Sequence, residues 1–375
     1  MQGHRPTYAE IDLDALLHNF CLARRQAGEG RVLVVVKADA YGHGAERVAP
    51  VLEAAGADLF GVALVEEGEA LRAAGVTRPV LVLGKTYPGQ EEALRRHRLT
   101  PALFDLETAH RLDRQAREVG SVCSYHLKID TGMARVGFRP EELPRVLEEL
   151  SSLEGLSMEG VFSHLALADE PENPFTDEQI ERFHQVLPRI RQAGFAPTYT
   201  HISNSAALFT RDVPECNLVR PGIVLYGGLP SDYFAQRLDL KPVMSVRTAV
   251  AQLKTVPAGT GVSYGHRFRA DRETVLATIP VGYADGYRRH LSGRGDVLIR
   301  GRRASVAGTV CMDWTLIDVT DIPGVRVGDV VTLLGTDGGE RVSAEEWAQK
   351  IGTIPYEVFC GIGKRVPRIY RGGSL

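Results

Sequence analysis

Hydrophobic and polar positions follow two different periods over the first two thirds of the chain. Short runs of Val, Ile and Leu predict buried strands, and stretches in which apolar residues recur every three or four positions predict amphipathic helices. The predicted strands are residues 31–36, 59–64, 80–83, 99–104, 123–129, 159–163, 198–202 and 217–220. The predicted helices are residues 12–27, 44–56, 66–75, 89–98, 105–119, 140–150, 176–193 and 204–209.

Eight strands that alternate with helices are typical of a closed parallel barrel, so we expect an α/β protein with a (β/α)8, TIM-like barrel. An open, doubly wound sheet is the alternative. It is disfavoured because no Gly-x-Gly-x-x-Gly motif, the usual dinucleotide-binding signature of that fold, follows any predicted strand.

The pattern changes after about residue 240, where Gly and Pro interrupt short β-type segments. Strands are predicted at residues 243–256, 274–281, 296–300, 303–308, 313–319 and 328–334, and a single helix is predicted at 343–351. We therefore expect two domains, a barrel over residues 1–240 and a mainly β domain over residues 241–375.

Composition removes several classes of function. The chain has 375 residues with 44 basic and 47 acidic side chains, which is not the charge distribution of a nucleic-acid-binding protein. Its five cysteines lack any Cys-x-x-Cys spacing, so neither a disulfide framework nor a metal site is expected. No apolar run approaches the ~18 residues of a membrane span, and no apolar leader opens the chain. A cytoplasmic protein without a membrane partner is the expectation.

Lys37 is the first candidate for chemistry. It directly follows the buried run that ends at Val36, and Tyr41, Gly42 and Gly44 come shortly after it. An amine at the end of a buried strand faces a cavity, where it loses its proton more easily than in water. A Schiff base with an aldehyde cofactor is the chemistry that such a lysine indicates.

The fifth strand carries polar side chains on one face. Strand alternation directs His126, Lys128 and Asp130 into the barrel and the intervening apolar residues toward the helices. Lys128 is then either neutral or paired, for instance in a structural ion pair with Asp130. Arg135, which follows in the next loop, is a candidate to bind a substrate carboxylate.

The last three barrel strands end in further polar residues. His164 follows the sixth strand, Ser205 opens the helix after the seventh, and Arg220 ends the eighth. Barrels often bind phosphate with the loops after strands seven and eight, so Ser205 and the amides around Gly222 and Ile223 form a candidate phosphate site. A plain helix cap is the other reading of Ser205.

Glycine-rich loops of the second domain carry tyrosines and an acid, at Tyr264, Tyr283, Asp313 and Tyr356. Each of these residues could simply pack a turn. Together they suggest a lid over the barrel mouth or a contact between subunits.

Six motifs in order resemble those of the alanine racemase family, which are fold-type III pyridoxal-phosphate enzymes. They are residues 36–44, 128–135, 220–227, 262–265, 311–313 and 354–357. The resemblance runs nearly end to end. It implies pyridoxal 5'-phosphate as cofactor, alanine as substrate, and a homodimer whose active site is shared between subunits. It also implies interconversion of L-alanine and D-alanine, with D-alanine supplied for peptidoglycan.

The resemblance also implies roles for individual residues. Lys37 corresponds to the lysine that binds the cofactor covalently, and Tyr264 to the second base, donated by the partner subunit. His164 corresponds to the link between that tyrosine and Arg220, and Arg220 faces the pyridine nitrogen. The other cofactor contacts correspond to Tyr41, Asn204, Ser205, Gly222, Ile223 and Tyr356.

Further correspondences concern the substrate. Arg135 and the backbone at Met312 match contacts to the substrate carboxylate, and Tyr283 and Asp313 match the entry corridor. Lys128 matches a lysine that is carbamylated in many members. The chain departs from the family at Thr309, where many members carry an arginine of the outer corridor.

Racemisation removes a proton from one face of a carbon and returns one to the other, which favours two bases on opposite faces over a single base. Lys37 and Tyr264 are the expected pair. A racemase with serine or broader specificity remains an alternative, and so does a non-catalytic cofactor-binding protein of the same barrel type, although the second domain with Tyr264 argues against it. A decarboxylase of the same fold type would place an acid where Arg220 stands.

Overall fold

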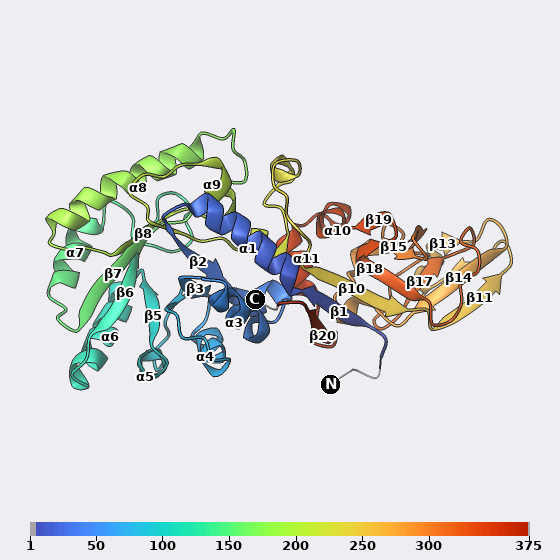
Figure 1. Ribbon diagram of the computed structural model, residues 1–375, viewed down its shortest axis with the longest axis horizontal. Coiled ribbons are helices and arrows are strands. Elements are labelled where there is room, and N and C mark those ends of the chain that lie inside the picture. Colours follow the sequence, from blue (N-terminus) through green and yellow to red (C-terminus); the bar gives the residue numbers. More distant parts are fainter. Residues whose placement is uncertain (1–4, 374–375) are drawn as a thin grey trace.

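The chain forms an elongated molecule with a barrel at one end and a β domain at the other (Figure 1), as described by a computed structural model for residues 5–373. Residues 1–4 and 374–375, which the predicted domains included, lie outside the described residues.

The barrel has the predicted parallel sheet of eight strands, whose order is β8-β7-β6-β5-β4-β3-β2-β9. Its strands are β2 (Arg31–Val35), β3 (Leu59–Val62), β4 (Val80–Val82), β5 (Leu99–Leu103), β6 (Cys123–Lys128), β7 (Leu156–Phe162), β8 (Tyr199–His201) and β9 (Leu218–Val219). The ring is nearly closed, because Arg220 N donates to Ser203 O (3.1 Å) beside the ends of β8 and β9. The predicted barrel is confirmed.

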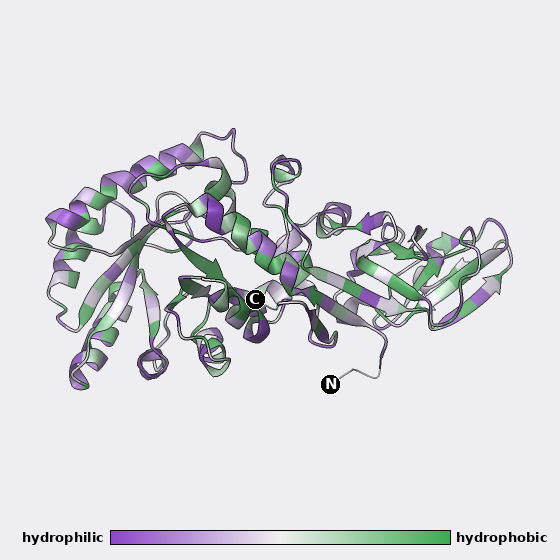
Figure 2. Cartoon of the chain, in the orientation of Figure 1, coloured by the Kyte–Doolittle hydropathy of each residue, from purple (hydrophilic) through white to green (hydrophobic). Residues whose placement is uncertain are grey.

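Helices cover the outside of the barrel close to the predicted positions. They are α1 (Leu13–Ala27), α3 (Ala45–Ala54), α4 (Val65–Ala73), α5 (Glu91–Arg96), α6 (Leu106–Glu118), α7 (Leu143–Ser151), α8 (Phe175–Gln192) and α9 (Ser205–Thr210). Asp12 starts α1 because its side chain accepts from Ala15 N at 2.8 Å. Figure 2 shows hydrophobic and hydrophilic positions alternating along α8, the pattern of a helix with one buried face.

The first described strand belongs to the sheet of the β domain. Strand β1 (Tyr8–Asp12) pairs antiparallel with β10 (Met244–Ala249) and parallel with β20 (Arg368–Arg371). The predicted barrel domain included residues 8–12, but their alternating burial, with Ala9 and Ile11 inside, suits the sheet of the other domain. Strands β1 and β20 therefore lie side by side between the barrel and the β domain (Figure 1).

The β domain contains three sheets. The largest has the order β16-β15-β18-β10-β1-β20, with β19 attached to β18; β11-β14-β17 and β12-β13 form the others. The remaining strands are β11 (Gln252–Val256), β12 (Gly261–Val262), β13 (Phe268–Arg269), β14 (Thr274–Ile279), β15 (Asp296–Ile299), β16 (Arg302–Ser305), β17 (Thr315–Asp318), β18 (Val330–Asp337) and β19 (Glu340–Val342).

The prediction of one continuous strand over residues 243–256 is wrong. The segment is divided into β10 and β11, which belong to different sheets. The chain crosses between them at Val250 and Ala251, whose amides donate to Asp329 O (2.9 Å) and Thr278 O (2.8 Å). A continuous apolar pattern does not reveal such a crossing, because both halves are strands.

The predicted helix of the second domain is confirmed as α10 (Ala344–Ile351). Ser343 caps it by accepting from Glu346 N at 3.2 Å. A second helix, α11 (Pro355–Gly361), was not predicted, and it packs against the segment that follows Lys37.

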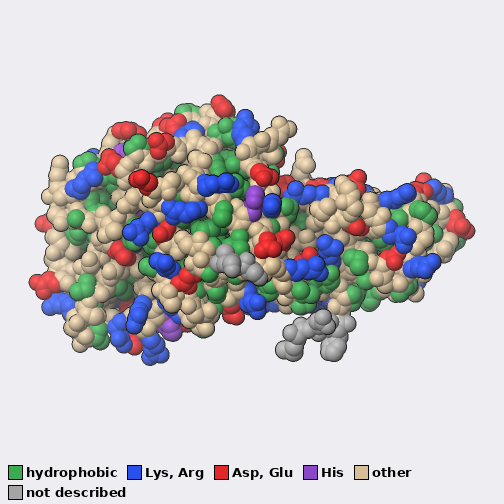
Figure 3. All heavy atoms as spheres, in the orientation of Figure 1, with side chains coloured by type: hydrophobic (Ala, Val, Ile, Leu, Met, Phe, Trp, Pro, Cys, Tyr) green, Lys and Arg blue, Asp and Glu red, His purple; other side chains and the backbone are tan. Residues whose placement is uncertain are grey.

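Within residues 5–373, no helix is long and apolar enough to cross a membrane, and no cluster of three or more His, Cys, Asp or Glu residues suits a metal ion. Basic and acidic side chains are interspersed on the face shown in Figure 3.

Candidate active site

A cavity of about 710 Å³ opens at the carboxyl ends of the barrel strands. It gathers most of the predicted barrel residues, namely Lys37, Tyr41, Lys128, Arg135, His164, Asn204, Ser205, Arg220, Gly222, Ile223 and Tyr356. The last of these comes from α11, so the C-terminal part of the chain also closes this end of the barrel.

Lys37 begins a short left-handed turn that the sequence did not predict. Four consecutive residues after it, Ala38 to Tyr41, have φ between 52° and 55°. None of them is glycine, and a left-handed helical conformation costs such residues roughly 1–2 kcal/mol each. Surrounding groups must therefore hold the turn in place.

Hydrogen bonds from three other segments hold this turn. Glu67, in the first turn of α4, accepts from Ala38 N at 2.6 Å. The Nδ1–H of His43 donates to the carbonyls of Ala40 and Tyr41, both at 3.0 Å. From β20, Arg368 Nε donates to Gly42 O at 3.0 Å. The conformation of the segment after Lys37 thus depends on residues in α4 and in β20, which are distant from it in the sequence.

Gly44 explains part of the glycine-rich motif after Lys37. A Cβ atom at this position would overlap the hydroxyl of Tyr370 in β20. That hydroxyl instead donates to His43 O at 3.1 Å. Part of the motif at residues 36–44 therefore serves to contact β20 rather than to bind a ligand.

The surroundings of Lys37 favour its neutral form. Burial lowers the pKa of its amine, and the positive charge of Arg135 lowers the pKa further. A neutral amine is the form that attacks an aldehyde or accepts a proton.

Arg220 is buried, and both Nη atoms of its guanidinium have hydrogen-bond partners. Its Nη1 donates to His201 Nδ1 (2.9 Å), and its Nη2 donates to His164 Nδ1 (3.2 Å) and to two backbone carbonyls. Burial lowers the pKa of Arg220 to about 10, so it remains a cation at neutral pH. Because a guanidinium can only donate, both histidines accept through Nδ1, and each neutral ring must carry its proton on Nε2.

The second histidine continues a chain of contacts across the barrel interior. His201 Nε2–H can only donate to His126 Nδ1, at 2.8 Å, which leaves the His126 proton on Nε2. That atom lies 3.5 Å from the carboxylate of Glu159. The sequence placed His126 inside the barrel but gave no sign of this partnership, because the residues come from three strands.

The cavity has a place for a phosphate group. Ser205 and Ile223 are the first residues of α9 and of a 3-10 turn (Ile223–Tyr226), so their amides have no acceptor within their own helices. A Cβ atom at Gly222 would lie 2.6 Å from the Tyr41 hydroxyl, which shows how closely this ring approaches the backbone. Asn204 caps α9 by accepting from the amides of Ala206 (3.1 Å) and Ala207 (3.0 Å).

These features fit pyridoxal phosphate. The hydroxyls of Tyr41 and Ser205 and the amide of Ile223 are donors that could bind the phosphate, and Gly222 N donates to Ser205 Oγ at 2.8 Å. Lys37 has an amine that could react with the aldehyde, and Arg220 lines the same cavity.

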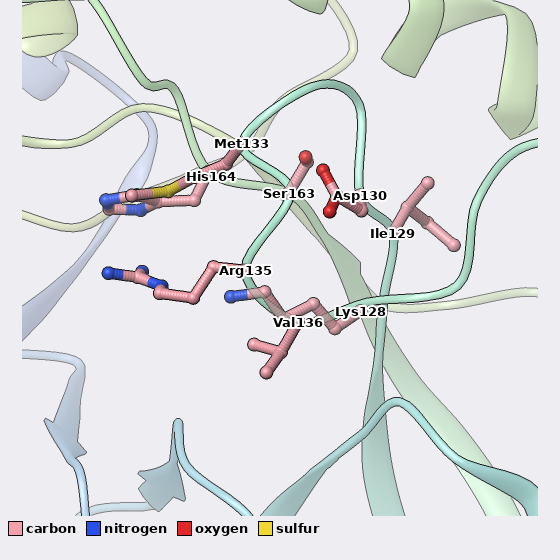
Figure 4. A pocket seen from close by; sticks show the side chains of 8 residues that line it. All are labelled: Lys128, Ile129, Asp130, Met133, Arg135, Val136, Ser163 and His164. Carbon is pink, nitrogen blue, oxygen red and sulfur yellow. The ribbon is translucent and has the colours of Figure 1, made fainter.

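Lys128 and Arg135 lie next to each other on one side of a small pocket (Figure 4). Their nitrogen ends and the ring of His164 point to the same side, whereas Ile129 points away. Within residues 5–373, Lys128 makes no ion pair with Asp130, so that reading is wrong; Asp130 accepts from Gly132 N and Ala134 N instead. Burial, with Arg220 and Arg135 nearby, lowers the pKa of Lys128 to about 7.

Apart from Tyr356, the predicted second-domain residues form a separate group that does not line the cavity. Tyr264 is 71% exposed and Met312 is 53% exposed. Their loops are joined through Cys311, whose carbonyl accepts from Tyr283 N at 3.0 Å and whose sulfur lies 3.4 Å from Ser263 Oγ. Asp313 accepts from Arg365 at 2.7 Å. One chain therefore does not bring Tyr264 and Lys37 together.

Comparison with known proteins gives a consistent result. Residues 11–230 match the family model for the alanine racemase N-terminal domain, and residues 243–370 match that for the C-terminal domain. The alanine racemase of Citrifermentans bemidjiense is 52% identical over 376 residues, which cover 98% of this chain and 99% of that protein.

Solved structures agree. The alanine racemase of Streptomyces lavendulae superimposes with a TM-score of 0.95 at 36% identity, covering 100% of this chain and 99% of the other. That of Bartonella henselae, solved with covalently bound pyridoxal phosphate, gives 0.89 at 30% identity, covering 98% and 99%.

Proposed function

The chain belongs to the alanine racemase family, and from this premise we propose that Lys37 and Tyr264 are the two bases that interconvert L-alanine and D-alanine. The observation that carries the proposal is the single cavity in which a lysine of lowered pKa, the Arg220–His164 pair and a phosphate site converge. The enzyme is a pyridoxal-phosphate-dependent isomerase.

The cofactor, when bound, withdraws electrons from the substrate α-carbon and so makes its hydrogen acidic. In our proposal, Tyr41, Ser205, Gly222 and Ile223 hold its phosphate, with Asn204 fixing the start of α9 and Tyr356 closing the site. Arg220, which stays protonated at neutral pH, would donate to the ring nitrogen. A permanent cation there does not readily transfer a proton to the ring, so electron withdrawal is moderate and side reactions such as transamination are limited.

Lys37 serves one face of the α-carbon and Tyr264 the other. With the cofactor and substrate bound, the free amine of Lys37 would take or return the α-proton at Nζ. A tyrosine has an ordinary pKa of about 10 and needs help to ionise. The Nε2–H of His164 can donate to the phenolate oxygen, and the charge of Arg220 behind His164 favours the negative form.

We propose that Tyr264 acts in the site of a second copy of the chain. Four large hydrophobic side chains on the loops that meet at Cys311 are exposed: Tyr264, Tyr283, Met312 and Trp314. Such a cluster suits a subunit contact. Head-to-tail pairing would place Tyr264 and Met312 over the partner's barrel cavity, and Tyr283 and Asp313 along its entrance.

Lys128 is proposed to be carbamylated. Its amine, with a pKa of about 7, is partly neutral at physiological pH and can bond to carbon dioxide through nitrogen, releasing one proton. The carbamate anion would lie beside Arg135 and orient its guanidinium toward the substrate carboxylate. Acid releases carbon dioxide from a carbamate, so mass spectrometry of an acidified peptide containing Lys128 would miss the modification. A high-resolution density map is therefore the test, and an unmodified Lys128 would count against the proposal.

Mixing two inactive variants tests both the bases and the shared site. Lys37→Ala should lose the visible absorbance of bound cofactor and all racemisation, whereas Tyr264→Phe should keep the absorbance and lose the turnover. After dissociation and reassociation, half of the dimers contain one chain of each kind, and each of these has one intact site. Activity should therefore return to about a quarter of the wild-type value, because the sites of a symmetric dimer are equivalent. No recovery from fully mixed dimers would refute the shared site.

We further propose that the D-alanine enters peptidoglycan synthesis and that the enzyme works in the cytoplasm. Five free cysteines within the described residues are in keeping with a reducing compartment.

A further inference from the structure

A buried threonine anchors the loop that carries Tyr264. Thr309 Oγ1 donates to the carbonyl of Tyr264 at 2.7 Å, and Ser263 Oγ donates back to the carbonyl of Thr309 at 2.6 Å. Thr309 is 1% exposed, so its side chain is enclosed by its own chain and does not face a substrate in the partner's cavity. It can therefore influence the reaction only through the residues it holds.

The anchored loop has an unfavourable backbone. Ser263, Gly265 and His266 all have positive φ, at 61°, 71° and 43°. Ser263 also combines its φ with ψ of −172°, a region that is almost restricted to glycine. A backbone of this kind keeps its shape only where neighbouring groups fix it, and the two bonds with Thr309 do so.

The tyrosine ring itself has little support in its own chain. Because its side chain is largely exposed, packing does not fix its position. The backbone carbonyl is the nearest fixed point, and Thr309 holds that carbonyl. A small displacement there would move the phenol oxygen at the far end of the side chain.

We propose that Thr309 is a positioning residue for the second base and that it fixes the distance between the Tyr264 phenol oxygen and the substrate α-carbon. The inference rests on the proposed role of Tyr264. It assigns a function to the position where the sequence departs from the family pattern: the hydroxyl of Thr309 acts on the loop rather than on the substrate.

Thr309→Val tests the bond, because valine keeps the shape and removes the donor. Thr309→Ser restores the donor. Thr315→Val is the matched control, since Thr315 Oγ1 donates to Val281 O at 2.8 Å and is equally buried in the same domain, but away from Tyr264. All variants are compared as holoenzymes with bound pyridoxal phosphate.

Two measurements separate positioning from stability. Racemisation by Thr309→Val should fall about 10-fold to 100-fold, as expected for a misplaced catalytic group, and Thr309→Ser should recover most of it. In D2O, exchange of the α-hydrogen can be followed for each enantiomer separately. Exchange on the Tyr264 face should slow, while exchange on the Lys37 face should stay at the wild-type rate. Thr315→Val should lower thermal stability without separating the two exchange rates.

Several results would overturn the inference. Thr309→Val could racemise at the wild-type rate, or α-hydrogen exchange could slow equally for both enantiomers, as a merely structural role would predict. Adding Thr309→Val to Tyr264→Phe should leave α-hydrogen exchange on the Lys37 face unchanged, and a slower exchange on that face would contradict action through Tyr264. A fully active Tyr264→Phe enzyme would overturn the proposed function as well, whereas an inactive Tyr264→Phe with a normal Thr309→Val would overturn only the role of Thr309.

Discussion

His43 makes a quantitative prediction about acid stability. Burial lowers the pKa of its imidazole to about 4, from an ordinary value of 6.5. The ring lies between Tyr226 and Phe359, and its Nδ1–H supports the left-handed turn after Lys37. Its Nε2 is buried and has no hydrogen-bond partner among the described residues, so a second proton there would have no acceptor.

The sign of the effect follows from proton binding. Between pH 6.5 and pH 4 the unfolded chain binds a proton at His43 and the folded chain does not, so acid favours unfolding. The contribution of His43 to stability is complete above pH 6.5 and is lost as the pH falls. The full loss is about 3 kcal/mol, and at pH 5 it is about 2 kcal/mol. For a domain of this size, that corresponds to a decrease in Tm of roughly 4–8 °C.

His43→Asn isolates this effect, because the amide keeps a donor near Nδ1 and does not titrate. Tm is measured at pH 7.5, 6 and 5 at constant ionic strength. The variant should be less stable at pH 7.5, because it loses two aromatic contacts, but its Tm should fall less toward pH 5, by roughly 4–8 °C. His290→Asn, an exposed histidine, controls for loss of an imidazole as such. The buried His126, His164 and His201 are present in the wild type and in both variants, so their contributions to the pH dependence of Tm cancel in the comparison. Parallel pH profiles for wild type and His43→Asn would refute the reasoning.

Three further predictions concern the cavity and its support. Glu67→Gln replaces one of the two oxygens that accept from Ala38 N (2.6 Å) and Ala63 N (2.7 Å) by an NH2 donor, which should loosen the turn after Lys37. Pyridoxal phosphate should then dissociate about tenfold faster or more, as measured by visible absorbance during dialysis. Arg220→Glu would provide an acid that can share a proton with the ring nitrogen, so transamination of alanine to pyruvate should become more frequent relative to racemisation. An unchanged ratio of pyruvate formed to alanine racemised would contradict the role assigned to Arg220. Tyr226→Phe removes the bond from its hydroxyl to Val35 O (2.9 Å) and should cost about 1–2 kcal/mol of stability, seen as a lower Tm, while kcat changes little.

The barrel could be predicted because its parallel strands are buried on both faces and appear as continuous apolar runs. The left-handed turn could not. Ala38, Asp39 and Ala40 have no strong preference for that conformation, and the groups that stabilise it include Arg368, more than three hundred positions later. The pairing of β1 was missed for the same reason, since its partners β10 and β20 lie at the other end of the chain. The predicted barrel residues line one cavity, and Tyr264, which the resemblance assigns to the partner's site, does not line the cavity of its own chain.

The charges of the cavity link cofactor binding to stability. Lys37, Lys128, Arg135 and Arg220 line it, and Asp169 is the acidic residue among the lining positions that the structure describes. The cations act on one another: Arg135 and Arg220 lower the pKa of Lys37, and Arg220, Arg135 and Lys37 lower the pKa of Lys128. A cavity with this excess of positive charge is unfavourable when empty and attracts anions. The cofactor phosphate, the substrate carboxylate and a carbamate on Lys128 are three such anions, so each should stabilise the fold as well as serve the reaction.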